Sequence, residues 1–173
     1  MLLWHEPILE TRRVSWPDEA GCAAWAQQLS HLLAHDEGLR DAHIQLLGSL
    51  GAGKTTFVRH LLRALGVSGR IKSPTYAVLE PHLAPPVPGS GRAAPWAVSH
   101  FDFYRFEHPR EWADAGFREV FAAPGLKLCE WPEKAAGVLP TPDLRLHIEL
   151  QPDDDSRSVL VQALTPVGQR LLA

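Results

Sequence analysis

The chain has 173 residues, a formal net charge of −3 and 45% apolar residues, and its two cysteines lie far apart. This length predicts one domain over 1–173, large enough to bury a hydrophobic core. The slightly acidic balance gives no overall positive field for nucleic acid, and two distant cysteines form no disulfide framework. We find no signal peptide and no apolar stretch of about 18 residues, so we expect a cytoplasmic protein without a membrane span.

The first part of the chain is expected to alternate strands and helices. A short strand is expected over 10–14, and a helix with an acidic first turn over 18–35. The run His43–Leu47 is short and mostly apolar, which suits a buried strand. This strand, a loop and a second helix form a unit over 42–66, in which Gly66 is placed to stop the helix.

Strands are expected to dominate the rest of the chain. After a short strand over 77–80, the segment 82–97 contains four prolines and two glycines, which predicts an exposed loop without chemistry between two strands. We therefore predict an α/β fold with an open sheet, mainly parallel with antiparallel additions, flanked by helices. The remaining expected elements are strands over 98–103, 126–130, 144–151 and 158–164, and helices over 109–121 and 166–173.

The loop that follows the strand 43–47 matches the phosphate-binding loop of P-loop NTPases. Its glycines let the backbone N–H groups point at phosphate oxygens, and the start of the helix adds the positive end of its dipole. Lys54 would reach the β- and γ-phosphates, and the Thr55 hydroxyl would ligate Mg²⁺. The segment therefore predicts a nucleoside triphosphate site in a P-loop NTPase-like fold. Its residues are Gly48, Ser49, Leu50, Gly51, Ala52, Gly53, Lys54 and Thr55.

Two carboxylates are expected at the ends of strands near this loop. Asp102 follows one apolar run and Glu130 another. Ligands in open α/β sheets bind at the carboxyl ends of the strands. Each carboxylate could hold Mg²⁺, directly or through water, or orient an attacking water. Each could equally cap the turn that follows its strand.

A further hydroxyl comes one short loop after the nucleotide-binding helix. Thr75 lies in the segment 72–76, which reads Lys-Ser-Pro-Thr-Tyr. A hydroxyl in such a loop can sense the γ-phosphate, as switch loops do. The residues alone favour the simpler interpretation, an ordinary Ser-Pro turn.

Four segments together resemble the TsaE family, the bacterial ATPase subunits of tRNA threonylcarbamoyladenosine biosynthesis. They are 50–57, 72–76, 100–105 and 130–133, which read LGAGKTTF, KSPTY, HFDFYR and EWPE. They occur in the family's order and approximate spacing, and the resemblance spans about 15–165. The phosphate loop alone is shared by a vast superfamily. The Ser-Pro-Thr, Asp-x-Tyr-Arg and Glu-Trp-Pro segments make the match specific.

The resemblance implies roles for individual residues. Lys54 and Thr55 would bind phosphate and Mg²⁺, and Glu130 would be a second metal ligand. Asp102 and Thr75 would serve hydrolysis or sensing of the γ-phosphate.

The resemblance also extends the expected nucleotide site. The binding loop would continue to Thr56, Glu19 at the first helix would lie beside the adenine, and Trp131 would pack near the site. Two features depart from the family's usual pattern. Members usually carry an acidic residue where this chain has Ser49, and the segment 82–97 is longer than usual.

The function implied by the resemblance is that of an ATPase, weak alone, which uses ATP and Mg²⁺ to drive a partner complex. The partners would be subunits of the TsaB and TsaD type, which modify tRNAs that read ANN codons. The chain shows no basic stripe with interleaved aromatic residues, so we expect it to act on tRNA only indirectly.

Two alternatives remain at this point. A small-molecule or nucleoside kinase of the P-loop class is equally short, and Arg105, Arg110 and Arg118 could supply the mobile lid that such enzymes need. A GTPase is disfavoured, because guanine is commonly selected by an Asn-Lys-x-Asp segment and the chain contains no asparagine.

Overall fold

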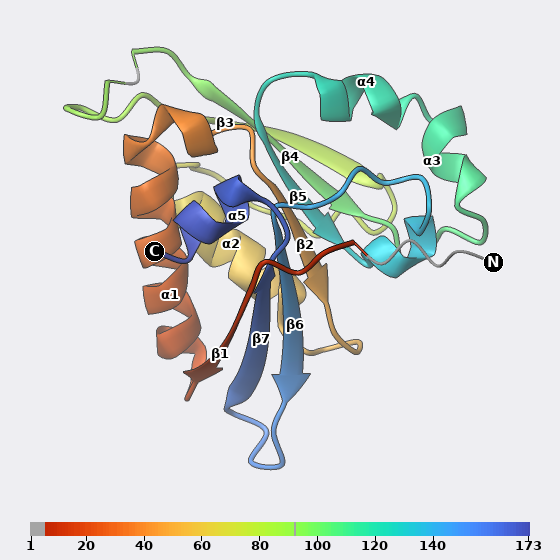
Figure 1. Cartoon of the computed structure of the whole chain (residues 1–173), viewed down its shortest axis with the longest axis horizontal. Helices are drawn as coiled ribbons and strands as arrows, with labels where there is room; N and C mark the ends of the chain where they lie inside the picture. Colours follow the sequence, from red (N-terminus) through yellow and green to blue (C-terminus); the bar gives the residue numbers. More distant parts are fainter. Residues whose placement is uncertain (1–5, 92) are drawn as a thin grey trace.

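The computed structural model describes residues 6–91 and 93–173 and is built on one seven-stranded sheet (Figure 1). Its strands are β1 (Glu10–Trp16), β2 (His43–Leu47), β3 (Leu79–Ala84), β4 (Trp96–Asp102), β5 (Leu126–Glu130), β6 (Leu144–Leu150) and β7 (Arg157–Ala163). They lie in the order β1-β7-β6-β2-β5-β4-β3.

The four central strands, β6, β2, β5 and β4, run parallel to one another. The outer strands β1, β7 and β3 pair antiparallel with their neighbours. This arrangement confirms the predicted open α/β sheet with antiparallel additions. Because β2, β5 and β4 are parallel neighbours, their carboxyl ends meet at one edge, where open α/β sheets bind ligands.

Helices cover both faces of this sheet. Figure 1 shows α1, α2 and α5 grouped on one side, with α3 and α4 on the other. Each side has its own core. The larger core packs α1 and α2 on the sheet, whereas Trp112 of α3 and Phe117 of α4 pack on Phe101 and Cys129. The helices are α1 (Glu19–His35), α2 (Lys54–Ala64), α3 (Arg110–Asp114), α4 (Phe117–Ala122) and α5 (Pro166–Leu171), with short 3₁₀ turns η1 (Glu37–Leu39) and η2 (Pro132–Ala135).

Helix α1 begins where its sequence provides a cap. The carboxylate of Asp18 accepts a hydrogen bond of 2.8 Å from the backbone N–H of Gly21, which satisfies a free donor of the first turn. Just before it, the ring of Trp16 stacks on Phe57 of α2, with centroids 5.6 Å apart and planes tilted by 12°. This contact fixes the end of β1 against the helix that follows the phosphate loop. Within the described residues, no helix is long and apolar enough to cross a membrane.

The largest differences in extent from the expected elements concern one helix and one strand. The helix expected over 109–121 is two short helices, because Gly116 takes a φ of +75° and interrupts the helical path between them. Strand β3 runs on to Ala84, into the expected loop, because its residues pair with β4 up to Trp96. Pro81 is tolerated there since β3 is an edge strand. Residue 92 of the expected loop lies outside the described residues.

Candidate nucleotide-binding site

The phosphate loop joins β2 to α2, as its motif predicts. Gly48 has a φ of +152°, and a Cβ there would lie 2.5 Å from the carbonyl oxygen of Ile148. Gly53 has a φ of +109° and caps α2, which begins at Lys54. Both positions need glycine for the backbone conformation, and Gly48 also needs it for space. The motif glycines therefore shape the turn that exposes the start of α2.

Lys54 is folded back onto the loop. Its side chain is only 5% exposed, and its Nζ donates hydrogen bonds to the carbonyl oxygens of Gly48 at 2.5 Å and Ser49 at 2.9 Å. The ammonium also lies 4.2 Å from the ring centre of Trp131, a cation–π contact. Burial lowers the pKa of Lys54, and nearby carboxylates, chiefly Glu130, oppose that shift. The loop thus holds a partly desolvated positive charge.

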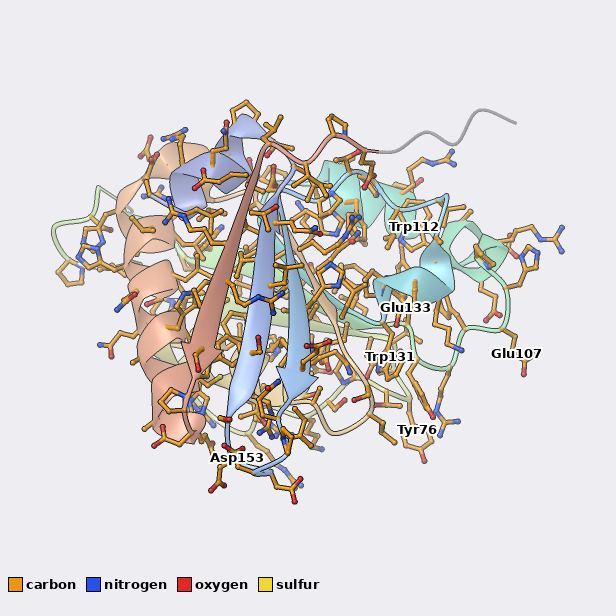
Figure 2. All side chains as sticks on the ribbon, turned by 60° about the horizontal axis from the view of Figure 1, so that its bottom comes forward. Tyr76, Glu107, Trp112, Trp131, Glu133 and Asp153 are labelled. Carbon is orange, nitrogen blue, oxygen red and sulfur yellow. The ribbon has the colours of Figure 1, made fainter. Side chains whose placement is uncertain are left out.

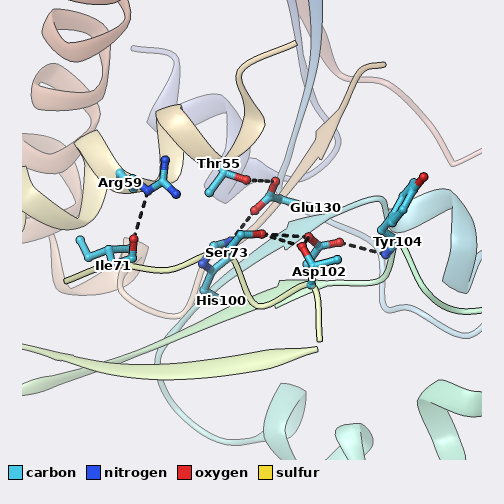
Figure 3. Close-up of polar contacts among 9 residues, drawn as sticks. Thr55, Arg59, Ile71, Ser73, His100, Asp102, Tyr104 and Glu130 are labelled. Carbon is cyan, nitrogen blue, oxygen red and sulfur yellow. Dashed lines mark hydrogen bonds and ion pairs between the residues drawn. The ribbon is translucent and has the colours of Figure 1, made fainter. Parts of the chain in front are cut away.

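Glu130 links the loop to the sheet (Figure 3). Its Oε1 accepts a hydrogen bond of 2.7 Å from the hydroxyl of Thr55, in the first turn of α2. Its Oε2 lies 2.6 Å from Nε2 of His100 on the neighbouring strand β4. Glu130 is 2% exposed and the His100 side chain is fully buried. Both oxygens of this carboxylate are therefore held in place.

Asp102 lies opposite Glu130 in the pairing of β4 with β5. Its Oδ2 accepts hydrogen bonds from the hydroxyls of Thr75 at 3.0 Å and Ser73 at 3.3 Å. Its Oδ1 accepts one of 2.9 Å from the backbone N–H of Tyr104. The same carboxylate therefore caps the turn after β4, as one of its two interpretations predicts, and also contacts the Ser-Pro-Thr segment. Its role toward Mg²⁺ or water stays a prediction.

These groups surround one cavity of about 260 Å³. The structure thus brings together five side chains that were expected to act on phosphate or metal, from α2, β4, β5 and the segment 72–76. Trp131 borders the cavity too, so it is more than a core residue. The lining residues are Leu50, Gly51, Gly53, Lys54, Thr55, Thr56, Ser73, Thr75, Asp102, Tyr104, Glu130 and Trp131.

A second cavity of about 190 Å³ lies beside the phosphate loop, next to α1. Gly53 and Thr56 line both cavities, and Glu19 and Ala52 line this one. Figure 2 shows the two sides of the molecule, with Trp131 and Tyr76 on one side and Asp153, at the tip of the β6–β7 hairpin, on the other. Glu19 therefore borders a cavity that adjoins the phosphate loop, and its expected place beside the adenine stays a prediction.

Four residues that contact the site or the phosphate loop were not predicted from the sequence as site residues. Strand alternation could have found His100, which lies two residues before Asp102 and so shares its face of β4. Ser73 is two residues before Thr75 and Tyr104 two after Asp102. Arg157, whose Nε donates to the carbonyl of Ala52 at 2.7 Å, comes from the distant strand β7 and has no local signal.

The parallel core and the glycine loop between β2 and α2 define a P-loop NTPase-like fold. The model of the family "Threonylcarbamoyl adenosine biosynthesis protein TsaE" matches residues 16–159. This chain belongs to the TsaE family.

Individual relatives agree with that assignment. The chain is 32% identical to the tRNA threonylcarbamoyladenosine biosynthesis protein TsaE of Haemophilus influenzae over 157 residues, covering 91% of this chain and 92% of the relative. It is 32% identical to the protein of that name from Bacillus subtilis over 127 residues, 73% and 71% of the two chains. The crystal structure of Bacillus subtilis YdiB has the same fold, with a TM-score of 0.71 at 21% identity over 94% of this chain and 92% of that one.

Proposed function

We propose that this protein is an ATPase that acts in the threonylcarbamoyladenosine modification of tRNAs that read ANN codons. The observation that carries the ATPase part is the convergence of Lys54, Thr55, Asp102 and Glu130 on one cavity beside the phosphate loop. The pathway is supported by the names of the relatives and by membership of the family.

The triphosphate would lie against the loop and the start of α2. Gly53 and the first turn of that helix offer backbone N–H groups and the positive end of the helix dipole. Lys54, now bonded to the carbonyls of Gly48 and Ser49, would exchange them for oxygens of the β- and γ-phosphates. Because the ammonium is already partly desolvated, it would lose little further hydration on meeting the anion.

The donors near the loop fit Mg²⁺. A hydroxyl from Thr55 and a carboxylate oxygen from Glu130 lie 2.7 Å apart at the cavity, and both are the hard oxygen ligands that this ion prefers. Proteins commonly give Mg²⁺ one or two such ligands and leave the rest to phosphate and water. When bound, the ion would neutralise charge that develops on the β- and γ-phosphates.

Asp102 is the candidate for orienting the attacking water. Its carboxylate lines the cavity, and the hydroxyls of Thr75 and Ser73 hold it at 3.0 and 3.3 Å. A change in these hydroxyls on binding of the γ-phosphate would move the carboxylate as well. The segment 72–76 is therefore proposed to sense the γ-phosphate and to adjust Asp102.

The proposed partners are subunits of the TsaB and TsaD type, and tRNA is reached through them in the cytoplasm. Exposed apolar side chains near the cavity support a partner surface there, since Leu50 is 75% exposed and Tyr76 83%. The guanidinium of Arg105 lies 3.8 Å from the ring centre of Tyr76. A partner that contacts this pair would reach the segment that holds Thr75.

Depletion of the protein in cells tests the pathway. We expect threonylcarbamoyladenosine to disappear from ANN-decoding tRNAs, as measured by mass spectrometry of digested tRNA, and unchanged modification would contradict the role. In vitro, ATP hydrolysis should be slow alone, and tRNA modification should require the partner subunits. Transfer of the γ-phosphate to a small-molecule or nucleoside acceptor, with no effect on tRNA, would favour the kinase alternative.

A further inference from the structure

His100 is buried in the sheet behind the metal-ligand candidate. It lies on β4, and its side chain is fully buried, so it borders the site without lining the cavity. Its Nε2 is 2.6 Å from Oε2 of Glu130. A carboxylate only accepts hydrogen bonds, so with Glu130 ionised the imidazole is the donor.

The contact with His100 offsets part of the free-energy cost of burying the Glu130 carboxylate. A carboxylate that is 2% exposed is costly unless both oxygens have hydrogen-bond partners. Oε1 faces the hydroxyl of Thr55, which would turn to the metal, and Oε2 faces His100. Once Thr55 turns away, the bond from His100 is what fixes the carboxylate. Free rotation of that group would move its oxygen away from the ion.

The backbone makes this support rigid. His100 and Asp102 lie on one face of β4, and Asp102 is directly opposite Glu130 on β5. One strand therefore carries both the residue that holds the metal ligand and the residue proposed to orient water. Their spacing is set by the sheet and not by a flexible loop.

We propose that His100 is a positioning residue that orients Glu130 for Mg²⁺. This inference rests on the proposed function, because it requires Mg²⁺ at Thr55 and Glu130. The imidazole N–H occupies Oε2 and leaves Oε1 directed at the hydroxyl and the ion. Such outer partners of metal ligands typically change metal affinity by about 10–100-fold when they are removed.

Binding of a non-hydrolysable ATP analogue, with Mg²⁺ and with EDTA, tests this role without turnover. His100→Leu removes the donor and keeps apolar volume, and His100→Asn leaves a polar group too short to reach Glu130. His100→Gln keeps an N–H at a similar distance from the backbone. We expect the apparent Mg²⁺ affinity to fall about 10–100-fold in the Leu and Asn variants. The Gln variant should restore most of it, and all should match the wild type in EDTA.

A double variant distinguishes a positioning role of His100 from a general loss of stability. In Glu130→Gln protein, His100→Leu should cause no further loss of Mg²⁺-dependent binding, because the ligand it supports is already changed. Circular dichroism checks the folding of each variant. The apparent Mg²⁺ affinity of whichever of the Leu and Asn variants folds is then compared with that of the wild type. Full Mg²⁺ dependence in a folded variant of this pair would overturn the inference and leave the ATPase proposal standing. Wild-type protein that binds the analogue equally with and without Mg²⁺ would overturn both.

Discussion

The hydroxyl of Thr55 donates a hydrogen bond of 2.7 Å to Oε1 of Glu130, which joins the first turn of α2 to the end of β5. The two residues are 75 positions apart in the chain, yet both were expected to ligate Mg²⁺. Their side chains already face one another across the edge of the sheet. Two oxygen donors held this way need little rearrangement to take a cation between them.

Glu130→Gln should weaken nucleotide binding in Mg²⁺ far more than it weakens folding. Glutamine keeps the shape of the side chain but loses the negative charge. Alanine would instead leave the buried imidazole of His100 without its partner, at a cost of about 1–3 kcal/mol. Titration of a nucleotide analogue at several Mg²⁺ concentrations checks the prediction. Glu119→Gln, at an exposed carboxylate on α4 that does not line the cavity, is the matched control. Unchanged Mg²⁺ dependence would make Glu130 structural.

Lys54→Ala should abolish hydrolysis and strongly weaken ATP binding. The ammonium is the buried cation of the loop, and loss of one such electrostatic contact typically lowers kcat at least about 100-fold. Phosphate release measures the rate, and equilibrium binding measures the affinity. Arg63→Ala removes a positive charge from the far end of the same helix and should leave both unchanged. Turnover at the wild-type rate in the Lys54 variant would exclude the assignment.

His43 should make the fold sensitive to acid. Burial, with smaller contributions from Lys127 and Arg145, lowers the pKa of His43 from 6.5 to about 3. Between these two values the unfolded chain binds a proton that the folded protein does not, so stability falls as the pH drops through this window. His43→Leu should remove up to about 1.4 kcal/mol per pH unit of that loss. Urea unfolding from pH 4.5 to 7.5 measures it. The exposed His108→Leu should keep the wild-type slope, and an equally steep slope in His43→Leu would contradict the buried, neutral histidine.

The fold could be predicted best where the local sequence alone determines an element. The run 43–47 is a strand with the expected bounds, as is 126–130, because both are short apolar segments buried in the centre of the sheet. The single helix expected over 109–121 missed the break at Gly116. The length of β3 depends on pairing with β4, which no local pattern reveals.

The residues of the site likewise divide into those that a local motif predicts and those whose place depends on strand pairing. The phosphate loop is a local motif, so its glycines and Lys54 were placed from sequence alone. The roles of Asp102 and Glu130 remained open without the family resemblance, because strand order decides which strand ends meet at the loop. The bond between Glu130 and His100 is likewise a product of the pairing of β4 with β5.

The segment that holds Thr75 has an inner and an outer anchor. The Thr75 hydroxyl contacts Asp102 at 3.0 Å, and the ring of the next residue, Tyr76, lies 3.8 Å from the guanidinium of Arg105. One anchor faces the cavity and the other is on the surface. A γ-phosphate that competes for the hydroxyl would therefore change the inner anchor first.

Thr75→Ala should leave nucleotide affinity nearly unchanged and reduce hydrolysis, because the hydroxyl that it removes holds Asp102, whereas most proposed contacts to the triphosphate come from Lys54, the loop and Mg²⁺. Thr75→Ser keeps the hydroxyl and should retain most of the rate. Limited proteolysis near Tyr76, which is 83% exposed, reports on the order of the segment. In the wild type we expect slower cleavage with a non-hydrolysable ATP analogue than with ADP, since a ligand shifts a conformation only through contacts that differ between the states. Identical cleavage with both nucleotides would show that the segment 72–76 is not a switch.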